Sequence, residues 1–446
     1  MSRLPSMSTA ATTAASHTTV ASQTRGGAPL HEDWVAVWIG AAIILMVIAG
    51  VRPAVPRFAW GTLAELSSVV LTVANLSRWL LLGLLLLVPA AIGAQLMRVP
   101  VVPFAGGFAV LYGLAWFAQV FAGYTGSSAV GLEYVIYALL IGLVLGQTTP
   151  LRRWFTSAVQ AEYYIKIGLV ILGASVLFSE LVQAGLLGIA QALIVVTSVW
   201  SFSFWLAKRM NIDDELATML SSAVSICGVS AAIATCGAIQ GDRKKLSYVT
   251  SLVLVCAVPM MLVMPWMSRV MGMPEAVAGA WLGGTLDTSA AVVAAGELVG
   301  EQARNAAVVV KLSQNVLIGV AAFLLTVWWS MRKGGGGSQK IGVGVIWERF
   351  PKFVLGFLGV SLVFSFLIPT DAVRNTRGLL TALRTGWFAL AFLSIGLETS
   401  IGDLARLGGG RPAVAFLGAQ AFNVVVTLVF AYLFFGGVLF SAPTFN

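Results

Sequence analysis

Long apolar runs recur along the chain and are separated by short polar connections. Several runs reach about 18 residues or more, the length that an α-helix needs to cross the hydrocarbon core of a bilayer. This pattern predicts about eleven ordinary membrane-spanning helices. Their expected ranges are 34–50, 79–97, 101–122, 132–146, 164–178, 185–206, 247–270, 305–331, 353–369, 379–399 and 412–440.

Two further apolar segments, 216–239 and 276–299, are interrupted by small and polar residues at their centres. The first contains "SICGVSAAIATCG" at 225–237 and the second "GTLDTSAAVVAAG" at 284–296. Unwound backbone inside a membrane is tolerated only where it is buried in protein or lines a cavity. We therefore predict two discontinuous helices, which either cross the membrane or re-enter it as hairpins. The alternative is that the shared Ser-Ala-Ala triplet only serves close packing of helices.

Composition supports an all-α polytopic membrane protein. The 446 residues are 58% hydrophobic and 10% charged, whereas soluble proteins carry about 25% charged residues. The chain therefore has too few charges to cover a surface that faces water. All three cysteines lie in apolar segments, so no disulfide framework is expected.

The chain has a formal net charge of +9, and the positions of its Lys and Arg residues indicate its orientation in the membrane. Lys and Arg gather in short connections between the predicted spans, and this bias favours a cytoplasmic N-terminus. The cluster "DRKK" at 242–245 lies on the cytoplasmic side only if segment 216–239 returns to the face from which it entered. This favours a re-entrant hairpin there. We expect no nucleic-acid partner, because no basic domain lies outside the predicted spans.

The pattern divides the chain into four parts. Residues 1–33 are rich in Ser, Thr and Ala and are expected to form a disordered tail. The transmembrane region at 34–331 contains both discontinuous helices. A soluble connection at 332–352 includes "GGGGS", a flexible-linker composition that is either natural or engineered. The C-terminal transmembrane helices occupy 353–446.

A second internal echo pairs "GASVLFSELVQAG" at 173–185 with "GLETSIGDLARLG" at 396–408. Acidic Glu180 aligns with acidic Asp403. An odd number of predicted crossings separates the two stretches, so they run in opposite directions. Inverted repeats with paired interrupted helices are typical of secondary transporters.

The interruptions carry groups that suit an anion. A helix that restarts after Gly228 or Thr288 presents free N–H groups and a partial positive charge, and such N-termini bind anions. The neighbouring hydroxyl groups belong to Ser225, Ser230, Thr288 and Ser289. The alternative is that these side chains only cap their own helices.

Two ionisable residues lie within apolar segments, Asp287 and Lys311. Such residues are costly in a membrane and are functional candidates by default. The alternatives are a shallow N-cap for Asp287 and a snorkelling side chain for Lys311. Asn315 lies four residues after Lys311 and shares its helix face. A Lys–Asp pair there would neutralise itself without substrate and exchange a proton or a substrate charge during transport.

Several stretches resemble one family. They are "GLVLGQ" (142–147), "KIGLVILGASV" (166–176), "SICGVSAAIA" (225–234), "VVAAGELVGEQARNAAVVVKL" (292–312) and "RFPKFVLGFL" (349–358). Over about residues 130–440 the chain resembles the sulfate exporter family of bacterial inner-membrane proteins. The resemblance implies a secondary transporter of the cation/proton-antiporter and anion-transporter type, with a small sulfur oxyanion or sulfonate as substrate.

The chain departs from that family at the second interruption. The family carries a His-Glu pair where this chain has Asp287-Thr288, and a glutamine where it has Ala291. The "SICG" stretch and Lys311 match the family, whereas the second half of the site matches only in position. The resemblance therefore does not fix the coupling ion.

We predict a secondary active transporter that exports a small anion, such as sulfate, sulfite or a sulfonate, across the cytoplasmic membrane. The substrate would lie between the two broken-helix tips. The expected binding residues are Ser225, Cys227, Gly228, Ser230, Asp287, Thr288, Ser289, Lys311 and Asn315. Expected partners are this anion, a proton or Na⁺ as coupling ion, and membrane lipid. A homodimer is one assembly that the sequence leaves undecided.

Other functions remain open at this point. They are a sodium- or proton-coupled uptake carrier for an organic anion, a cation/proton antiporter centred on Asp287, and a passive channel. An intramembrane enzyme is least favoured, because the sequence places no base near Cys227. We assign no catalytic residue, no cofactor and no metal site.

Overall fold

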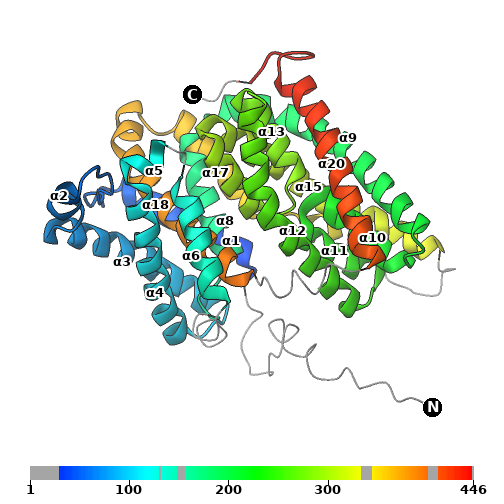
Figure 1. Ribbon diagram of the computed structural model, residues 1–446, viewed down its shortest axis with the longest axis horizontal. Coiled ribbons are helices and arrows are strands. Elements are labelled where there is room, and N and C mark those ends of the chain that lie inside the picture. The colour runs from blue at the N-terminus through cyan, green and yellow to red at the C-terminus, as the bar shows by residue number, and fades with distance from the viewer. Residues whose placement is uncertain (1–29, 130–131, 148–155, 333–343, 400–409, 444–446) are drawn as a thin grey trace.

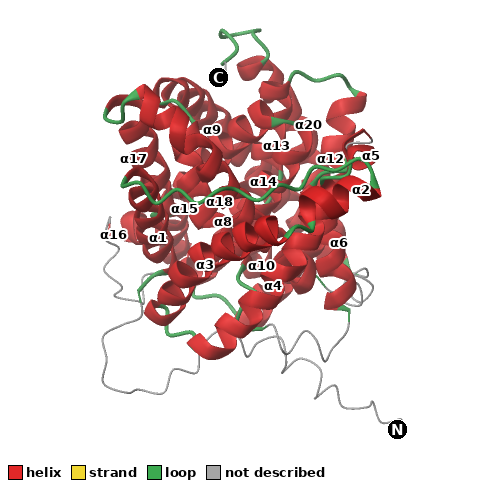
Figure 2. Cartoon of the chain, turned by 90° about the vertical axis from the view of Figure 1, so that its left-hand side faces the viewer, coloured by secondary structure: helices red, strands yellow, loops and turns green. Residues whose placement is uncertain are grey.

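The computed structural model describes residues 30–129, 132–147, 156–332, 344–399 and 410–443. These residues form helices joined by loops (Figure 2). Their β-structure is limited to an isolated bridge between Trp60 and Tyr124. The expected tail, the "GGGGS" stretch and the second copy of the Glu180 echo fall largely or wholly outside these residues.

Eight helices of the described chain are long and apolar enough to cross a membrane. They are α3 (Val73–Leu96), α4 (Val101–Ala122), α9 (Phe178–Arg209), the segment Asp214–Ile239, α12 (Arg243–Val270), α15 (Glu301–Arg332), α18 (Thr370–Glu398) and α20 (Arg411–Phe435). Three shorter apolar helices are α6 (Tyr134–Gly146), α14 (Ser289–Val299) and α17 (Phe353–Phe366). The all-α membrane class is confirmed, whereas the count of about eleven ordinary spans stays a prediction.

The helices form two groups that lie side by side (Figure 1). The first group, which we call the scaffold group, contains α3, α4, α6, α17 and α18 together with α1 (Glu32–Ile48) and α8 (Ala161–Leu172). The second, the tip group, contains α9, α12, α14, α15 and α20, together with α10 (Asp214–Ser222), α11 (Gly228–Ile239) and α13 (Glu275–Thr285).

Small residues bring the scaffold helices into close contact. A Cβ atom at Gly142 of α6 would lie 2.3 Å from the carbonyl oxygen of Leu393 of α18, and one at Gly146 would lie 2.7 Å from that of Leu397. Only glycine fits such backbone contacts, which are common between membrane helices. The tight packing of α6 on α18 gives the scaffold group a rigid centre.

Candidate functional site

Helices α10 and α11 leave and return to the same end of the tip group. Asp213 caps α10, and the Nζ atom of Lys245, at the start of α12, lies 2.6 Å from Asp213 Oδ1. Between the two helices the chain passes through a π-helical turn, η3 (Ala223–Cys227). Gly228 follows with φ of 34°, a conformation that favours glycine. The tip of this segment is therefore formed by the residues around Cys227 and Gly228.

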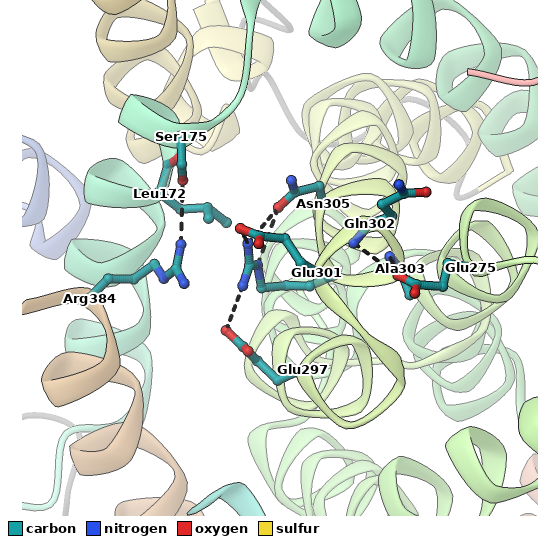
Figure 3. A network of polar contacts seen from close by, with 10 residues as sticks. Leu172, Ser175, Glu275, Glu297, Glu301, Gln302, Ala303, Asn305 and Arg384 are labelled. Atoms are coloured by element: carbon teal, nitrogen blue, oxygen red, sulfur yellow. Dashed lines mark hydrogen bonds and ion pairs between the residues drawn. The ribbon is translucent and has the colours of Figure 1, made fainter. Parts of the chain in front are cut away.

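Helices α13 and α14 are joined in the same way. At their base, Glu275 Oε2 accepts hydrogen bonds from the backbone N–H groups of Gln302 at 3.1 Å and Ala303 at 3.3 Å (Figure 3). At the other end, Leu286 and Asp287 separate the two helices, and the hydroxyl of Thr288 accepts a hydrogen bond from the backbone N–H of Ala291. Thr288 thus serves as the N-cap of α14.

The two segments enter the tip group from opposite ends. Helix α12 follows the base of the first segment and precedes the base of the second, and its 28 residues span about 42 Å at about 1.5 Å per residue. The tips meet between these ends. A Cβ atom added at Gly228 would lie 3.2 Å from both the Cβ and the carbonyl oxygen of Asp287.

Lys311 of α15 joins the two tips. Its ammonium group donates hydrogen bonds to the carbonyl oxygens of Ile226 and Leu286, both at 2.7 Å, and to Gln314 Oε1 at 3.1 Å. Its side chain is buried, with 2% of the residue exposed, so it does not snorkel. The ammonium is not ion-paired with Asp287 within 4.0 Å; two backbone carbonyls and the Gln314 amide oxygen accept its hydrogen bonds.

Three amide side chains that the sequence analysis missed also hold the tips. Asn423 of α20 donates to the carbonyl oxygens of Val224 at 3.1 Å and Thr285 at 3.3 Å, one from each tip. Gln420 donates to Thr285 O at 3.1 Å, and Gln314 donates to Gly284 O at 2.9 Å. In the sequence, polar residues at 420, 423 and 427 within the apolar stretch 412–440 could have indicated that this helix contributes to the site.

Several buried acceptors beside the tips keep unused hydrogen-bonding capacity. Among the described residues, nothing within hydrogen-bond geometry donates to either carboxylate oxygen of Asp287, to Asn315 Oδ1 or to Gln420 Oε1. Buried polar groups are rarely left without partners in native proteins, and exceptions concentrate at functional sites. The tips therefore carry polar groups beyond those that hold the fold.

A pocket of about 430 Å³ opens between the two helix groups and reaches the tips. Its floor contains Cys227, Ser230, Ser289 and Asn315, and Asn315 Nδ2 donates to Ser289 Oγ at 3.2 Å. Its walls carry charges from the scaffold group and from α16 (Gly344–Arg349). Those charged side chains are Glu32, Asp33, Glu162, Lys166, Glu348 and Arg349. Lys166 Nζ pairs with Glu32 at 2.7 Å and with Asp33 at 2.9 Å.

The predicted site residues fall into three sets. Cys227, Ser230, Ser289 and Asn315 face the pocket, as noted above. Gly228, Asp287 and Lys311 lie behind this floor, where the tips touch. The remaining two have local roles: Ser225 Oγ donates to Ser221 O at 2.7 Å, and Thr288 caps α14.

The fold and site define a polytopic α-helical membrane protein with a polar pocket between two helix groups. A family model described as "Conserved hypothetical protein 698" matches residues 106–415, and the chain belongs to this family.

Similar proteins carry membrane-protein names. A UPF0324 membrane protein of Rhodopirellula baltica is 40% identical over 367 residues, which cover 80% of this chain and 68% of the relative. One from Nitratidesulfovibrio vulgaris is 38% identical over 357 residues, covering 77% of this chain and 62% of the relative. The UPF0324 inner membrane protein YeiH of Escherichia coli is 24% identical over 315 residues, covering 69% of this chain and 84% of YeiH. No solved structure matches.

Proposed function

We propose that this protein is a secondary active transporter that carries a small anion, such as sulfate, sulfite or a sulfonate, across the cytoplasmic membrane. The observation that carries the proposal is the bridge from Lys311 to Ile226 O and Leu286 O. This bridge supports a buried positive charge beside the contact between the two interrupted segments. Paired interrupted helices at the bilayer midplane are how many secondary transporters bind substrate.

The groups around the pocket floor suit an oxyanion. Ser230 and Ser289 offer hydroxyl donors, and Asn315 offers an amide. Helices α11 and α14 both begin at the tips, so their free N–H groups and partial positive charges add to the attraction. The ammonium group of Lys311, which lies behind the pocket floor, adds a full positive charge. Such an arrangement would bind an anion without a metal or a cofactor.

The distribution of open and closed regions suits alternating access. The pocket opens at the end of the bundle where Asp213 and Lys245 lie, which the Lys and Arg bias predicts to be cytoplasmic. At the opposite end, Arg304 of α15 bonds to Glu297 and Glu301. Arg384 of the scaffold group lies opposite these two acidic residues (Figure 3). Movement of the tip group against the scaffold group would open this second end and close the first.

Charge balance at the tips bears on the direction of transport. With Asp287 ionised, Lys311 and Asp287 cancel, whereas protonation of Asp287 leaves one net positive charge beside the pocket. An anion would then bind together with a proton, and an inward proton gradient would drive uptake. Proton-coupled uptake is therefore the second candidate, while export is the direction that the family resemblance implies.

Counterflow in proteoliposomes tests the proposal. Vesicles loaded with unlabelled sulfite, sulfate or taurine should accumulate the labelled anion from outside, and the rate should saturate. The Lys311→Ala variant should lose counterflow, while exposed Lys208→Ala should retain it. Leakage without saturation would indicate a channel. Cation flux with no anion counterflow would indicate an antiporter centred on Asp287.

A further inference from the structure

A second pocket, of about 290 Å³, lies in the scaffold group at the end opposite the first. Helices α8 and α17 show that the two pockets lie at opposite ends, because each helix contributes residues to both pockets. The first pocket is lined by Glu162 of α8 and Phe353 of α17, close to where each helix begins. The second is lined by Ile171 and Phe364, close to where the same helices end. It is therefore separate from the tips and from the transport site proposed above.

The second pocket is cationic with apolar walls. Arg377 and Arg384 of α18 both line it, and none of its lining residues in the described chain is acidic. The two arginines are seven residues apart, so they lie on one face of the helix. Arg377 is exposed and Arg384 is buried. The pocket therefore carries one positive charge near its mouth and another at its inner end.

Arg384 has little of its hydrogen-bonding capacity satisfied. One Nη atom donates to Ser175 Oγ over a long 3.4 Å, and among the described residues no acceptor is available to Nε (Figure 3). Only 5% of the residue is exposed. A buried guanidinium group normally has a carboxylate or several carbonyl partners. Arg384 therefore keeps donors free in a pocket whose lining has no carboxylate.

The neighbouring acidic groups already have a partner. Arg304 lies 3.2 Å from Glu297 and 2.9 Å from Glu301, and it also donates to Asn305. Its burial is similar to that of Arg384. The two arginines thus differ in their bonding: Arg304 is ion-paired within the tip group, whereas Arg384 forms no ion pair within 4.0 Å in the described chain.

We propose that this pocket binds a monovalent organic anion with an apolar body. The carboxylate, sulfonate or phosphate group would accept hydrogen bonds from Nε and an Nη atom of Arg384, which lie on one edge of the planar guanidinium fork. Arg377 attracts the anion at the mouth. Ile171, Val176, Phe364 and Leu380 pack against the apolar body. The volume lies at the small end of ligand pockets, which selects a short or partly inserted chain.

Thermal unfolding of the purified protein in a non-ionic detergent tests the site, with hexanesulfonate as the probe. A ligand that binds only the folded protein raises Tm. Hexanesulfonate should raise it in proportion to the logarithm of its concentration, whereas methanesulfonate and neutral hexanol should not. Arg384→Gln should weaken the affinity about tenfold or more. Arg374→Gln, on the same helix but outside the pocket, should leave the shift unchanged.

Two further variants separate this site from the tips and from folding defects. Lys311→Ala should keep the hexanesulfonate shift, and its loss in that variant would place the anion at the tips and overturn the proposal. Thr381→Trp fills the pocket while leaving both arginines in the sequence. It should abolish the shift even if Arg384→Gln fails to fold. A full shift in Thr381→Trp would contradict the proposal.

The anion can come from lipid or from solution, and nanodiscs distinguish these sources. If an anionic phospholipid occupies the pocket, hexanesulfonate should stabilise the protein less in phosphatidylglycerol than in phosphatidylcholine, and Arg384→Gln should remove this difference. If the ligand is soluble, the shift should be equal in both lipids. No shift in either lipid would refute the site.

Discussion

The backbones of Gly228 and Asp287 lie in close contact where the two tips meet, although 59 residues separate them along the chain. A side chain of even one carbon at position 228 would lie 2.6 Å from Val253 Cγ1 and 3.2 Å from Asp287 Cβ. The contact joins segments that enter from opposite ends of the tip group. Because Lys311 bonds to a carbonyl group beside each of these two residues, the tips and α15 form one unit.

Gly228→Ala should disturb this unit. The φ of 34° and the contacts with Val253 and Asp287 both disfavour a Cβ atom, and strain of this kind costs about 1–3 kcal/mol. We expect a lower Tm and loss of anion counterflow. Gly113→Ala is the matched control, because a Cβ atom there meets nothing within 4 Å. Equal effects of the two substitutions would argue against tight contact of the tips.

Lys311→Met should weaken anion binding. Methionine keeps the length of the side chain but removes the charge and the hydrogen bonds to Ile226 O and Leu286 O. Loss of a charged hydrogen-bond partner reduces affinity by about tenfold or more. Isothermal titration with sulfite and taurine measures this change. Wild-type affinity in Lys311→Met would show that the anion binds elsewhere.

Asp287→Asn tests the coupling ion. Asparagine has the shape of aspartate but carries no titratable proton, so a proton-coupled carrier should lose the pH dependence of flux while still binding the anion. The measurement is the initial rate of counterflow in vesicles buffered across the neutral range. If the pH profile of Asp287→Asn matched that of the wild-type protein, the proton would be carried by another group.

The ion pair between Asp213 and Lys245, at the base of the segment formed by α10 and α11, should weaken in acid. Partial burial acts to raise the pKa of Asp213, but hydrogen bonds from Lys245 and from the backbone N–H of Leu216 outweigh it and hold this pKa below its ordinary value of 3.8. The ion pair therefore stabilises the fold above the unfolded-state pKa, and this stability is lost as the pH falls through the lower folded-state pKa.

The size of this effect should be small, because Asp213 is half exposed. Surface pairs contribute about 1 kcal/mol or less. Tm of Asp213→Asn should lie slightly below that of the wild-type protein at neutral pH, and the gap should close only below the ordinary aspartate pKa. A gap that stays constant down to that acidity would contradict the assignment.

Local sequence pattern predicted the helical membrane class and drew attention to polar stretches within two apolar segments. Long apolar runs fix which segments are helical in a membrane, and predicted span 101–122 coincides with α4. The polar and small residues at 225–230 and 287–289 marked both tips, because an apolar segment has little other reason to contain them. Lys311 stood out for the same reason.

The sequence alone could not predict which groups form hydrogen bonds with the buried polar side chains. Lys311 suggested an ion pair with Asp287, yet its nearest acceptors are two carbonyl groups, which every residue carries and which local spacing cannot single out. Asn423 bonds to residues more than 130 positions away. Hydrophobic pattern cannot distinguish a helix face that meets lipid from one that meets protein, so contacts between distant helices stayed unpredicted.

The central claim is that a small anion binds where the two tips meet, and Cys227 reports on it directly. This thiol faces the pocket floor, and Cys236→Ser with Cys256→Ser would leave it as the single cysteine. Its labelling by a membrane-impermeant methanethiosulfonate should be measured in inside-out vesicles with sulfate, sulfite, thiosulfate, taurine, isethionate or a dicarboxylate. We expect one of these anions to slow labelling, and Lys311→Ala to remove the protection. Labelling that no anion slows would contradict an anion site between the tips, and protection that persists in Lys311→Ala would contradict the role of Lys311 in that site.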